Sequence, residues 1–277
     1  MFRKIVADSS ANLLGTDFAD FASVPLRILA GDREYVDDEA LDVPGMQEDL
    51  RKYKGRSSTA CPGTGDWLAA FGEAEEVFGV SITSHLSGCY NSARIAAEEY
   101  TAEHPDRKVF VLDSLTTGPE MQLIVEEYER LIGAGHSFEQ ICEEIVAYTG
   151  RTRLLFSLES LMNFAKNGRI SQALAAVAGL LGIRMVGRAS TEGELELLHK
   201  CRGEKKAIQQ LWKCMLDEGY KGGRVRIHHS CNPEGAESLA AEIRAGYPDC
   251  DIRIGENRGL CSYYAEKGGI LVGFEGE

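Results

Sequence analysis

Short apolar runs alternate with amphipathic segments over the first half of the chain. Runs rich in valine, isoleucine and phenylalanine predict strands, and apolar residues three or four positions apart predict helices. The expected strands are Lys4–Ala7, Val24–Leu29, its hairpin return Arg33–Val36, Val77–Ile82 and Lys108–Leu112. The expected helices are Pro44–Tyr53, a segment from Thr64, a segment ending at Tyr100, Pro119–Ile132, and Phe138–Tyr148 with Ser137 as its N-cap. Strands that alternate with helices indicate an α/β fold, here a Rossmann-like parallel sheet with helices on both faces.

The pattern changes near Arg151, where strands and helices stop alternating one by one. Hydrophobic periodicity predicts the strands Thr152–Ser157, Arg184–Ala189, Glu194–Lys200, Arg224–His229, Asp251–Ile254 and Ile270–Phe274. It predicts the helices Leu158–Asn167, Glu204–Leu216 and Glu234–Ala245. Such an order is typical of an α+β domain, so we divide the chain into an N-terminal domain, 1–150, and a C-terminal domain, 151–277.

One segment of the second half, Ile170–Gly182, is apolar on nearly every side of the helix that it predicts. Such a helix is usually buried in a protein core. Its many alanine and glycine residues also leave space beside the backbone for a slender ligand, and a long hydrocarbon is one candidate. The pattern alone leaves both interpretations open.

Polar loops follow the expected strands of the first half at Asp8–Ser10, Ser84–Gly88 and Asp113–Gly118. The carboxyl ends of parallel strands meet at one edge of a sheet, and ligands bind outside that edge. Ser87 and Gly88 also precede a helix, whose first N–H groups suit a phosphate or a carboxylate. If these loops are only structural, Ser87 is an N-cap and Asp8–Ser10 form a turn or cap. A further hydroxyl-rich loop precedes the helix from Thr64 and contains Ser57, Ser58 and Thr59.

Composition narrows the classes of partner. The formal net charge of −13 argues against a nucleic-acid partner, because binding to phosphates needs clustered lysine and arginine. No apolar run reaches the ~20 residues of a membrane-spanning helix, and the first residues carry no signal-length run. We therefore expect a cytoplasmic protein without a membrane-spanning segment.

The cysteines and histidines do not indicate a metal site. The eight cysteines are at least eleven positions apart, and no CxxC occurs. Disulfides are not expected in a reducing compartment. His228 and His229 are adjacent in an expected strand, so their side chains point to opposite faces. We expect no metal and no cofactor.

Several segments in order along the chain resemble motifs of the DegV family, whose members bind fatty acids and form the lipid-carrying subunit of bacterial fatty acid kinase. The most specific is SITSHLSGCYNSA (Ser81–Ala93), which resembles Ser-Ser-x-Leu-Ser-Gly-Thr-Tyr-x-Ser-Ala. The others are IVADSSANL (Ile5–Leu13), VPLRILAGDREYVDD (Val24–Asp38), SSTACPG (Ser57–Gly63), LESLMNFAKNGRIS (Leu158–Ser171) and KCRGEKKA (Lys200–Ala207). The resemblance covers nearly the whole chain.

The resemblance implies a binding protein rather than an enzyme. It places a long-chain fatty acid in a closed apolar tunnel between or within the domains, beside the Ile170–Gly182 segment. The carboxylate would be held by loop hydroxyls and presented to a separate kinase, the catalytic subunit, for acyl phosphate formation. Arginines near the carboxylate would serve docking or phosphoryl transfer. Carried over residue by residue, the ligand-binding residues are Thr59, Ser87, Gly88, Ser58, Arg169 and Arg202.

The sequence departs from the family motifs at three places. Cys61 stands where the motif Thr-Ser-Gln-Pro-Ser has glutamine, and Cys89 stands where threonine follows Ser-Gly. The motif His-x-Gly-Pro-Gly near the C-terminus is missing. Lys267 or Glu266 would take the place of its histidine.

Two other classes of function are weaker. A serine hydrolase acting on a lipid-like ester would use Ser87 as its nucleophile, but the sequence lacks a GxSxG elbow, and His85 is too near in sequence to act easily as its base. A triad with a distant histidine stays open. A nucleotide-binding enzyme is also weak, because neither GxGxxG nor GxxxxGK[ST] occurs.

Overall fold

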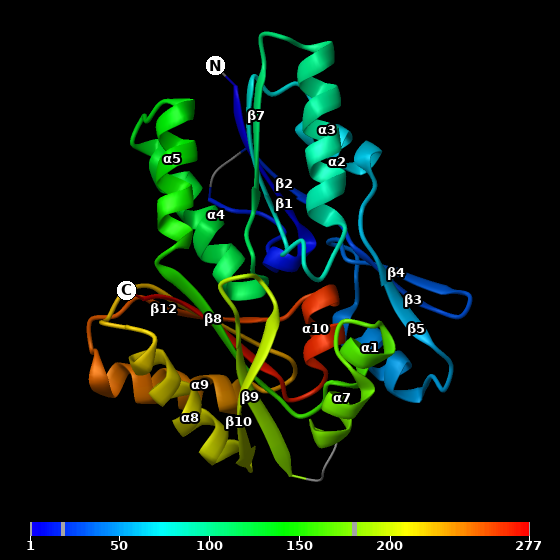
Figure 1. The fold of residues 1–277 in the computed structure, drawn as a ribbon, viewed down its shortest axis with the longest axis vertical. Coiled ribbons are helices and arrows are strands. Elements are labelled where there is room, and N and C mark those ends of the chain that lie inside the picture. The colour runs from blue at the N-terminus through cyan, green and yellow to red at the C-terminus, as the bar shows by residue number, and fades with distance from the viewer. Residues whose placement is uncertain (1, 18–19, 179–181, 277) are drawn as a thin grey trace.

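The first half of the chain folds around a sheet of four strands, each parallel to its neighbours (Figure 1). The structure is a computed structural model that describes residues 2–17, 20–178 and 182–276. The strand order is β2-β1-β6-β7, with β1 Arg3–Asp8, β2 Phe21–Val24, β6 Glu76–Ser81 and β7 Lys108–Asp113. The Rossmann-like sheet expected from the sequence is confirmed.

Helices cover both faces of this parallel sheet. Ile5 and Phe78 pack on one face and their neighbours Val6 and Val77 on the other, because successive side chains of a strand alternate. Helices α4 Gly118–Gly133 and α5 Phe138–Thr149 cover the first face, and α2 Thr64–Phe71 and α3 Cys89–Glu103 cover the second. Ser137 is the N-cap of α5, as expected, and its hydroxyl accepts from the N–H of Gln140 at 3.3 Å.

The second half forms a mixed sheet of six strands, which agrees with the α+β expectation. Its order is β10-β9-β8-β13-β11-β12, and the last strand of the chain, β13, lies antiparallel between β8 and β11. The strands are β8 Thr152–Leu158, β9 Ile183–Ala189, β10 Leu195–Arg202, β11 Val225–His229, β12 Ile252–Glu256 and β13 Ile270–Glu275. Helices α8 Glu204–Asp217 and α9 Pro233–Gly246 cover its outer face. The domain boundary at residue 150 stays a prediction.

A third, small sheet corrects two expectations. Val24–Leu29 is not one strand, because Pro25 lacks the N–H that a continuous ladder requires. After it, β3 Arg27–Ala30 pairs with β4 Arg33–Val36 and with β5 Ser57–Ala60, and α1 Val43–Lys52 follows β4. Residues Ser57–Ala60 are therefore a strand, although we expected a loop. Pairing with a distant strand is not visible in local sequence.

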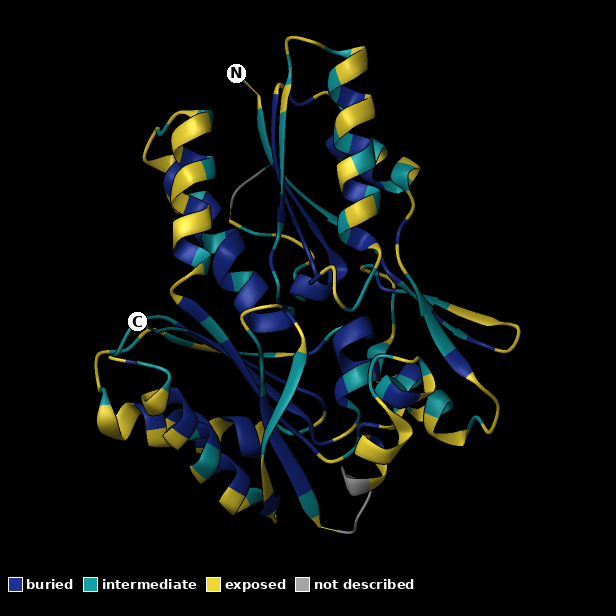
Figure 2. Ribbon diagram, in the orientation of Figure 1, coloured by how far each residue is buried: buried dark blue, intermediate teal, exposed yellow. Residues whose placement is uncertain are grey.

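The segments that connect β8 to β9 are shorter and more exposed than expected. The helices here are α6 Met162–Lys166 and α7 Gln172–Ala178. Along α7, Ala175 is buried, whereas Gln172, Ala173, Leu174 and Ala176 are exposed, as the colouring in Figure 2 shows. The expectation of a buried helix is wrong for these residues. The expected helix continued to Gly182, and 179–181 lie outside the described residues.

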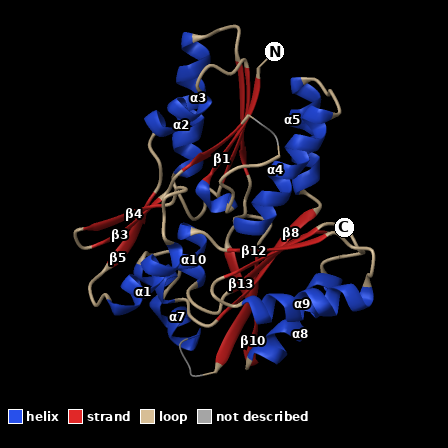
Figure 3. Ribbon diagram, turned by 180° about the vertical axis from the view of Figure 1, so that it is seen from behind, coloured by secondary structure: helices blue, strands red, loops and turns tan. Residues whose placement is uncertain are grey.

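Helix α10, Gly259–Ala265, was not expected, and it carries part of the C-terminal half into the N-terminal half. It lies beside α1 and the small sheet (Figure 3). The buried carboxylate of Asp37, just after β4, accepts from the N–H groups of Gly259 at 2.8 Å and Leu260 at 2.9 Å. A Cβ on Gly259 would lie 2.6 Å from that carboxylate, so only glycine fits this approach. Asp37 thus fixes where the helix begins.

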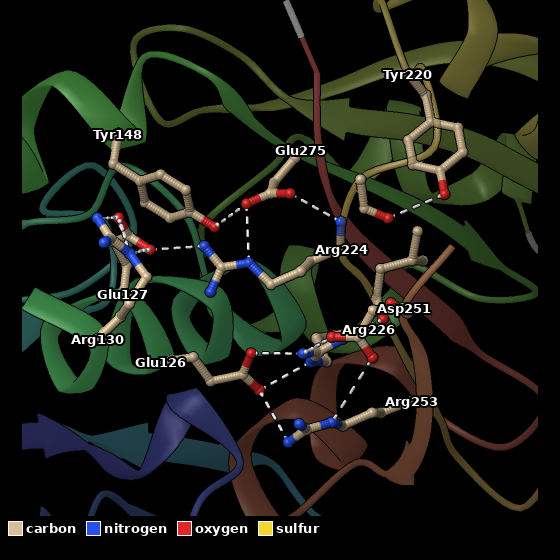
Figure 4. Close-up of polar contacts among 12 residues, drawn as sticks. Glu126, Glu127, Arg130, Tyr148, Tyr220, Arg224, Arg226, Asp251, Arg253 and Glu275 are labelled. Atoms are coloured by element: carbon tan, nitrogen blue, oxygen red, sulfur yellow. Dashed lines mark hydrogen bonds and ion pairs between the residues drawn. The ribbon is translucent and has the colours of Figure 1, made fainter. Parts of the chain in front are cut away.

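Helix α4 lies between the two large sheets, and a set of ion pairs joins its outer end to the second sheet (Figure 4). Arg226, 1 % exposed, donates to both carboxylate oxygens of Glu126 at 2.8 and 2.6 Å and to Asp251 at 2.9 Å. Arg224 donates to Glu127 at 2.7 Å and to Glu275 at 2.9 Å. The name charged junction is used below for these six residues: Glu126, Glu127, Arg224, Arg226, Asp251 and Glu275. None of the helices in the described ranges is long and apolar enough to cross a membrane.

Candidate functional site

A cavity lies between the two halves of the molecule, below the carboxyl ends of the parallel strands. It encloses about 810 Å³ of space, counting the solvent at its open mouth. Its wall is mostly apolar and comes from β5, β8, β9, β10, β13, α6, α10 and the loops that follow β6 and β7. The apolar lining residues are Leu26, Ile82, Leu86, Leu154, Phe156, Leu158, Phe164, Ala189, Leu195, Leu260, Ala265 and Leu271.

Polar groups gather at one part of this wall. The hydroxyl of Thr59, on β5, forms a hydrogen bond of 2.8 Å with the hydroxyl of Tyr264, on α10. The positive charge of Arg169 lies near enough to Tyr264 to influence the pKa of that hydroxyl. The Nε of Arg169 donates to the carbonyl of Leu86 at 3.1 Å. Ser87 follows in the chain and also lines the cavity. Four polar side chains from separate segments therefore converge on one place.

The loop that carries Ser87 ends at the first turn of α3. Gly88 is the N-cap residue and has no side chain to bond the helix, so the hydroxyl of Ser87 accepts from the N–H of Cys89 at 3.3 Å instead. The same hydroxyl donates to the sulfur of Cys89 at 3.2 Å. The N-cap that we expected at Ser87 is therefore Gly88, although the hydroxyl of Ser87 bonds the first N–H of α3 and Ser87 lines the cavity.

Electrostatics leave this part of the wall with a positive charge and neutral hydroxyls. Arg169 donates to the carbonyls of Leu86 and Asn167, at 3.1 and 2.8 Å, and no carboxylate pairs with it in the part of the chain that the structure describes. Burial raises the pKa of Tyr264 above its ordinary value, so its hydroxyl stays protonated. The arrangement can therefore donate hydrogen bonds to an anion at the end of an apolar cavity.

The expected ligand residues are only partly brought together. Thr59, Ser87 and Arg169 line the cavity. Ser58 does not, because its side chain points to the opposite face of β5 from Thr59. Gly88 is exposed and lies next to the lining rather than in it. The binding roles of these residues stay predictions.

Arg202 is not brought to the cavity. It is the last, exposed residue of β10, whereas Leu195, at the other end of that strand, lines the wall. Seven residues of extended strand separate them by roughly 23 Å. The position that we expected for Arg202, near the carboxylate end, is therefore wrong.

The described residues show no group of three or more histidine, cysteine, aspartate or glutamate side chains that could hold a metal ion. The histidines also contribute nothing to the described lining of the cavity. His85 lies 3.8 Å from the exposed carboxylate of Glu194, and within the described ranges its side chain forms no hydrogen bond with Ser87.

The family model described as "Uncharacterised protein, DegV family" matches residues 3–276. A DegV domain-containing protein of Streptococcus pneumoniae is 45 % identical over 276 residues, which is 98 % of each chain. The chain belongs to the DegV family. Among solved structures, a DegV family protein of Eubacterium eligens loaded with heptadecanoic acid superposes with a TM-score of 0.97 at 45 % identity, covering 99 % of this chain and 100 % of that one. The S. pneumoniae fatty acid kinase B3 protein, loaded with linoleic acid, gives 0.98 at 43 % identity, with full coverage of both chains.

Within this DegV fold, neither residue that we expected in place of the missing histidine motif reaches the cavity. Lys267 is exposed, and the carboxylate of Glu266 accepts from the hydroxyl of Ser160 at 2.7 Å; neither lines the cavity. Tyr264 reaches Thr59 instead. The available signal was the spacing of Leu260, Cys261 and Tyr264, which all line the cavity from one side of a helical turn.

Proposed function

We propose that this protein binds a long-chain fatty acid in the cavity between its two halves and presents the carboxylate to a separate kinase. The observation that carries the proposal is an apolar cavity of about 810 Å³ that ends at Thr59, Ser87, Tyr264 and Arg169. The fatty-acid-loaded DegV structures support it, because they share both the fold and more than 40 % of the residues.

The tail supplies most of the affinity in this proposal. Each buried methylene contributes about 0.8 kcal/mol, whereas one hydrogen bond contributes about 0.5–1.5 kcal/mol net. A chain of fatty-acid length therefore gains on the order of 10 kcal/mol from its methylenes. The hydroxyls and Arg169 fix the position of the acid group.

The carboxylate end lies near the surface, which suits transfer of a phosphoryl group by a second protein. Ser84, His85, Gly88 and Cys61 around the site are exposed. The structural neighbour named as a fatty acid kinase B3 protein supports a kinase partner for this chain. The protein then acts in the cytoplasm as a carrier, without catalysis, a resident cofactor or a nucleic-acid partner of its own.

A serine hydrolase is the rival class. It needs a base for Ser87, yet the hydroxyl of Ser87 donates to the sulfur of Cys89, and no histidine lines the described cavity wall. The hydrolase would be favoured if the natural chain hydrolyses a fatty ester and Ser87→Ala does not.

The experiment compares alanine variants of three hydroxyl residues, Thr59, Ser87 and Ser58. The protein is purified, its lipid is extracted under denaturing conditions and identified by mass spectrometry, and acyl phosphate formation is assayed with a fatty acid kinase catalytic subunit and ATP. Thr59→Ala and Ser87→Ala should lower acyl phosphate formation by about tenfold or more, a loss of one or two hydrogen bonds, while much of the lipid is retained. Ser58→Ala is the matched control, because that hydroxyl faces away from the cavity.

The proposal fails at two separate points. If the extract contains no fatty acid and the protein takes up none that is added, the proposed ligand is wrong. Equal kinase turnover in all three variants would remove Thr59 and Ser87 from the head-group site while leaving the cavity in place.

A further inference from the structure

Two cysteines meet beside the proposed head-group site, and the function above uses neither. Cys61 lies on the exposed turn between β5 and α2, and Cys89 is the first residue of α3 and is fully buried. A Cβ on Gly88 would lie 3.3 Å from the sulfur of Cys61, so the turn approaches the start of α3 closely. The thiols of Cys89 and Cys61 lie close enough to affect each other's ionisation, and neither cysteine forms a disulfide.

A continuous chain of polar contacts connects this pair to the cavity. The hydroxyl of Ser87 donates to the sulfur of Cys89 at 3.2 Å, and the thiol of Cys89 interacts with that of Cys61. Ser92, in the first turn of α3, also bonds the sulfur of Cys61, and the guanidinium of Arg169 acts on it from the cavity side. The chain therefore runs from a surface thiol to a lining hydroxyl.

The two thiols have opposite character. The hydrogen bond from Cys89 holds the pKa of Cys61 at about 6, with help from Ser92 and Arg169. The same bond, burial and the nearby carboxylate of Asp8 raise the pKa of Cys89 well above its ordinary value. An exposed thiolate next to a protonated thiol is the arrangement of a peroxide-reactive cysteine with its resolving partner.

We propose that Cys61 and Cys89 form a redox modification site for hydrogen peroxide or a related hydroperoxide. The thiolate of Cys61 attacks one peroxide oxygen, the O–O bond breaks, and hydroxide leaves as water after taking up a proton. The sulfur of Cys89 then attacks the sulfenic acid, an S–S bond forms, and the S–O bond breaks. The proton of Cys89 leaves with that hydroxide as a second water, so two thiols are oxidised and one peroxide is reduced.

The first step prepares the second. Conversion of Cys61 to a neutral sulfenic acid removes the negative neighbour that holds the proton on Cys89. The S–S bond brings the sulfurs to about 2.05 Å and turns the sulfur of Cys89 into a poorer hydrogen-bond acceptor. The hydroxyl of Ser87 then loses its acceptor at 3.2 Å. This last consequence, a change at the head-group site, rests on the proposed function, whereas the disulfide itself does not.

The test uses the full chain with Cys61→Ser, Cys89→Ser and Cys231→Ser. Cys231 is the matched control, because its thiol is also exposed but contacts Gln47 rather than another cysteine. Each protein receives an equimolar amount of hydrogen peroxide, remaining thiols are alkylated, and peptides are analysed by mass spectrometry. We expect a Cys61–Cys89 disulfide in the natural chain and in Cys231→Ser, and a Cys61 sulfenic acid trapped by dimedone in Cys89→Ser.

A pH profile separates the proposed pair from an ordinary thiol. The alkylation rate of Cys61 should fall by half near pH 6, and that of a free thiol near pH 8.5. The midpoint is a sharper readout than the rate itself, since a lower pKa also lowers intrinsic nucleophilicity. In Cys89→Ala, which removes the hydrogen-bonding group next to Cys61, the midpoint of Cys61 should rise.

Two results overturn the site: Cys61 stays reduced under peroxide, or Cys61 and Cys231 oxidise at equal rates without a cross-link. A final arm compares kinase turnover of oxidised and re-reduced protein loaded with fatty acid. A severalfold loss restored by reductant supports the connection to Ser87. Unchanged turnover with the disulfide formed removes that connection and leaves the modification site in place.

Discussion

The two halves of the molecule meet in two regions that use opposite chemistry. At the charged junction every charged side chain has a partner of opposite charge, and Arg226 binds both Glu126 and Asp251 (Figure 4). At the part of the cavity wall near Thr59, the polar groups are hydroxyls, with Arg169 as a cation that no described carboxylate neutralises. The junction is satisfied from within the chain. The cavity leaves one charge for a partner from outside.

Helix α4 shows the same contrast along its own length. Glu120, in its first turn, bonds only the hydroxyls of Thr116 and Thr152, at 2.5 and 2.7 Å, and burial raises its pKa to about 7. Glu127 is also buried, which opposes ionisation, but hydrogen bonds from Arg130 and Arg224 hold its pKa below its ordinary value. Hydroxyls alone do not keep a buried carboxylate charged, and guanidinium groups do. An acid group in the cavity therefore depends on Arg169 for its charge.

The largest effect is expected at the junction. Arg226→Met removes the buried cation that bonds Glu126 and leaves that carboxylate with only the exposed Arg253 at 3.8 Å, which should lower the free energy of unfolding by about 3–5 kcal/mol, measured by urea denaturation. Arg253→Met is the matched control, because Arg253 faces the same Glu126 and Asp251 at 3.8 and 3.9 Å but is 61 % exposed. An equal loss in both variants would contradict the distinction between buried and exposed pairs.

The second effect concerns Glu120 and pH. Its folded pKa of about 7 lies above the ordinary 4.5, so its stabilising contribution is present below pH 4.5 and is lost as pH rises through 7. Relative to Glu120→Gln, the natural chain should lose up to about 3 kcal/mol of unfolding free energy between pH 4 and pH 8. Taking the difference between the two proteins cancels other titrating groups. A difference that is constant with pH would show that Glu120 stays charged.

A third prediction fills the cavity without touching its polar groups. Leu195→Trp should displace roughly three methylenes of a bound acid and weaken retention by about 2 kcal/mol, or some thirtyfold. Leu198→Trp is the control, since Leu198 is on the same strand but packs on the opposite side of the sheet. The readout is a fluorescent fatty acid displaced by unlabelled acid. Weaker binding in Leu198→Trp alone would place the ligand elsewhere.

The smallest effect is expected from Tyr264→Phe, which removes one hydroxyl next to Thr59 and should weaken binding of the acid by about 1 kcal/mol, roughly fivefold. Tyr263→Phe removes a hydroxyl bonded to Ser57 and Asn167, away from the cavity. It should lower stability and leave binding unchanged in the same displacement assay. Unchanged binding in Tyr264→Phe would remove that hydroxyl from the head-group site.

Local sequence predicts those parts of the fold that local physics determines. The parallel sheet follows from apolar runs that end in polar turns, and Ser137 from its capping box. The family resemblance identified Thr59, Ser87 and Arg169, which the fold brings to one cavity. These residues lie on short motifs whose order along the chain is recognisable.

The remaining features depend on contacts between distant segments. β5 is a strand only because β3 pairs with it, and α10 begins at Gly259 because the carboxylate of Asp37 is placed there by β4. Tyr264 therefore could not be assigned from its own neighbourhood. Arg202 was misplaced for a related reason: a conserved-looking motif gives a residue's identity but not the end of the strand on which it lies.

The place of β13 in the second sheet determines when, during synthesis, the cavity can form. β13 comes after the other described strands in the sequence, yet it lies between β8 and β11 in the sheet. Its residue Leu271 forms part of the cavity wall. Because synthesis proceeds from the N-terminus, the cavity wall is incomplete until β13 has been made. If the cavity holds a fatty acid, as proposed, a nascent chain cannot enclose that ligand before β13 has been made.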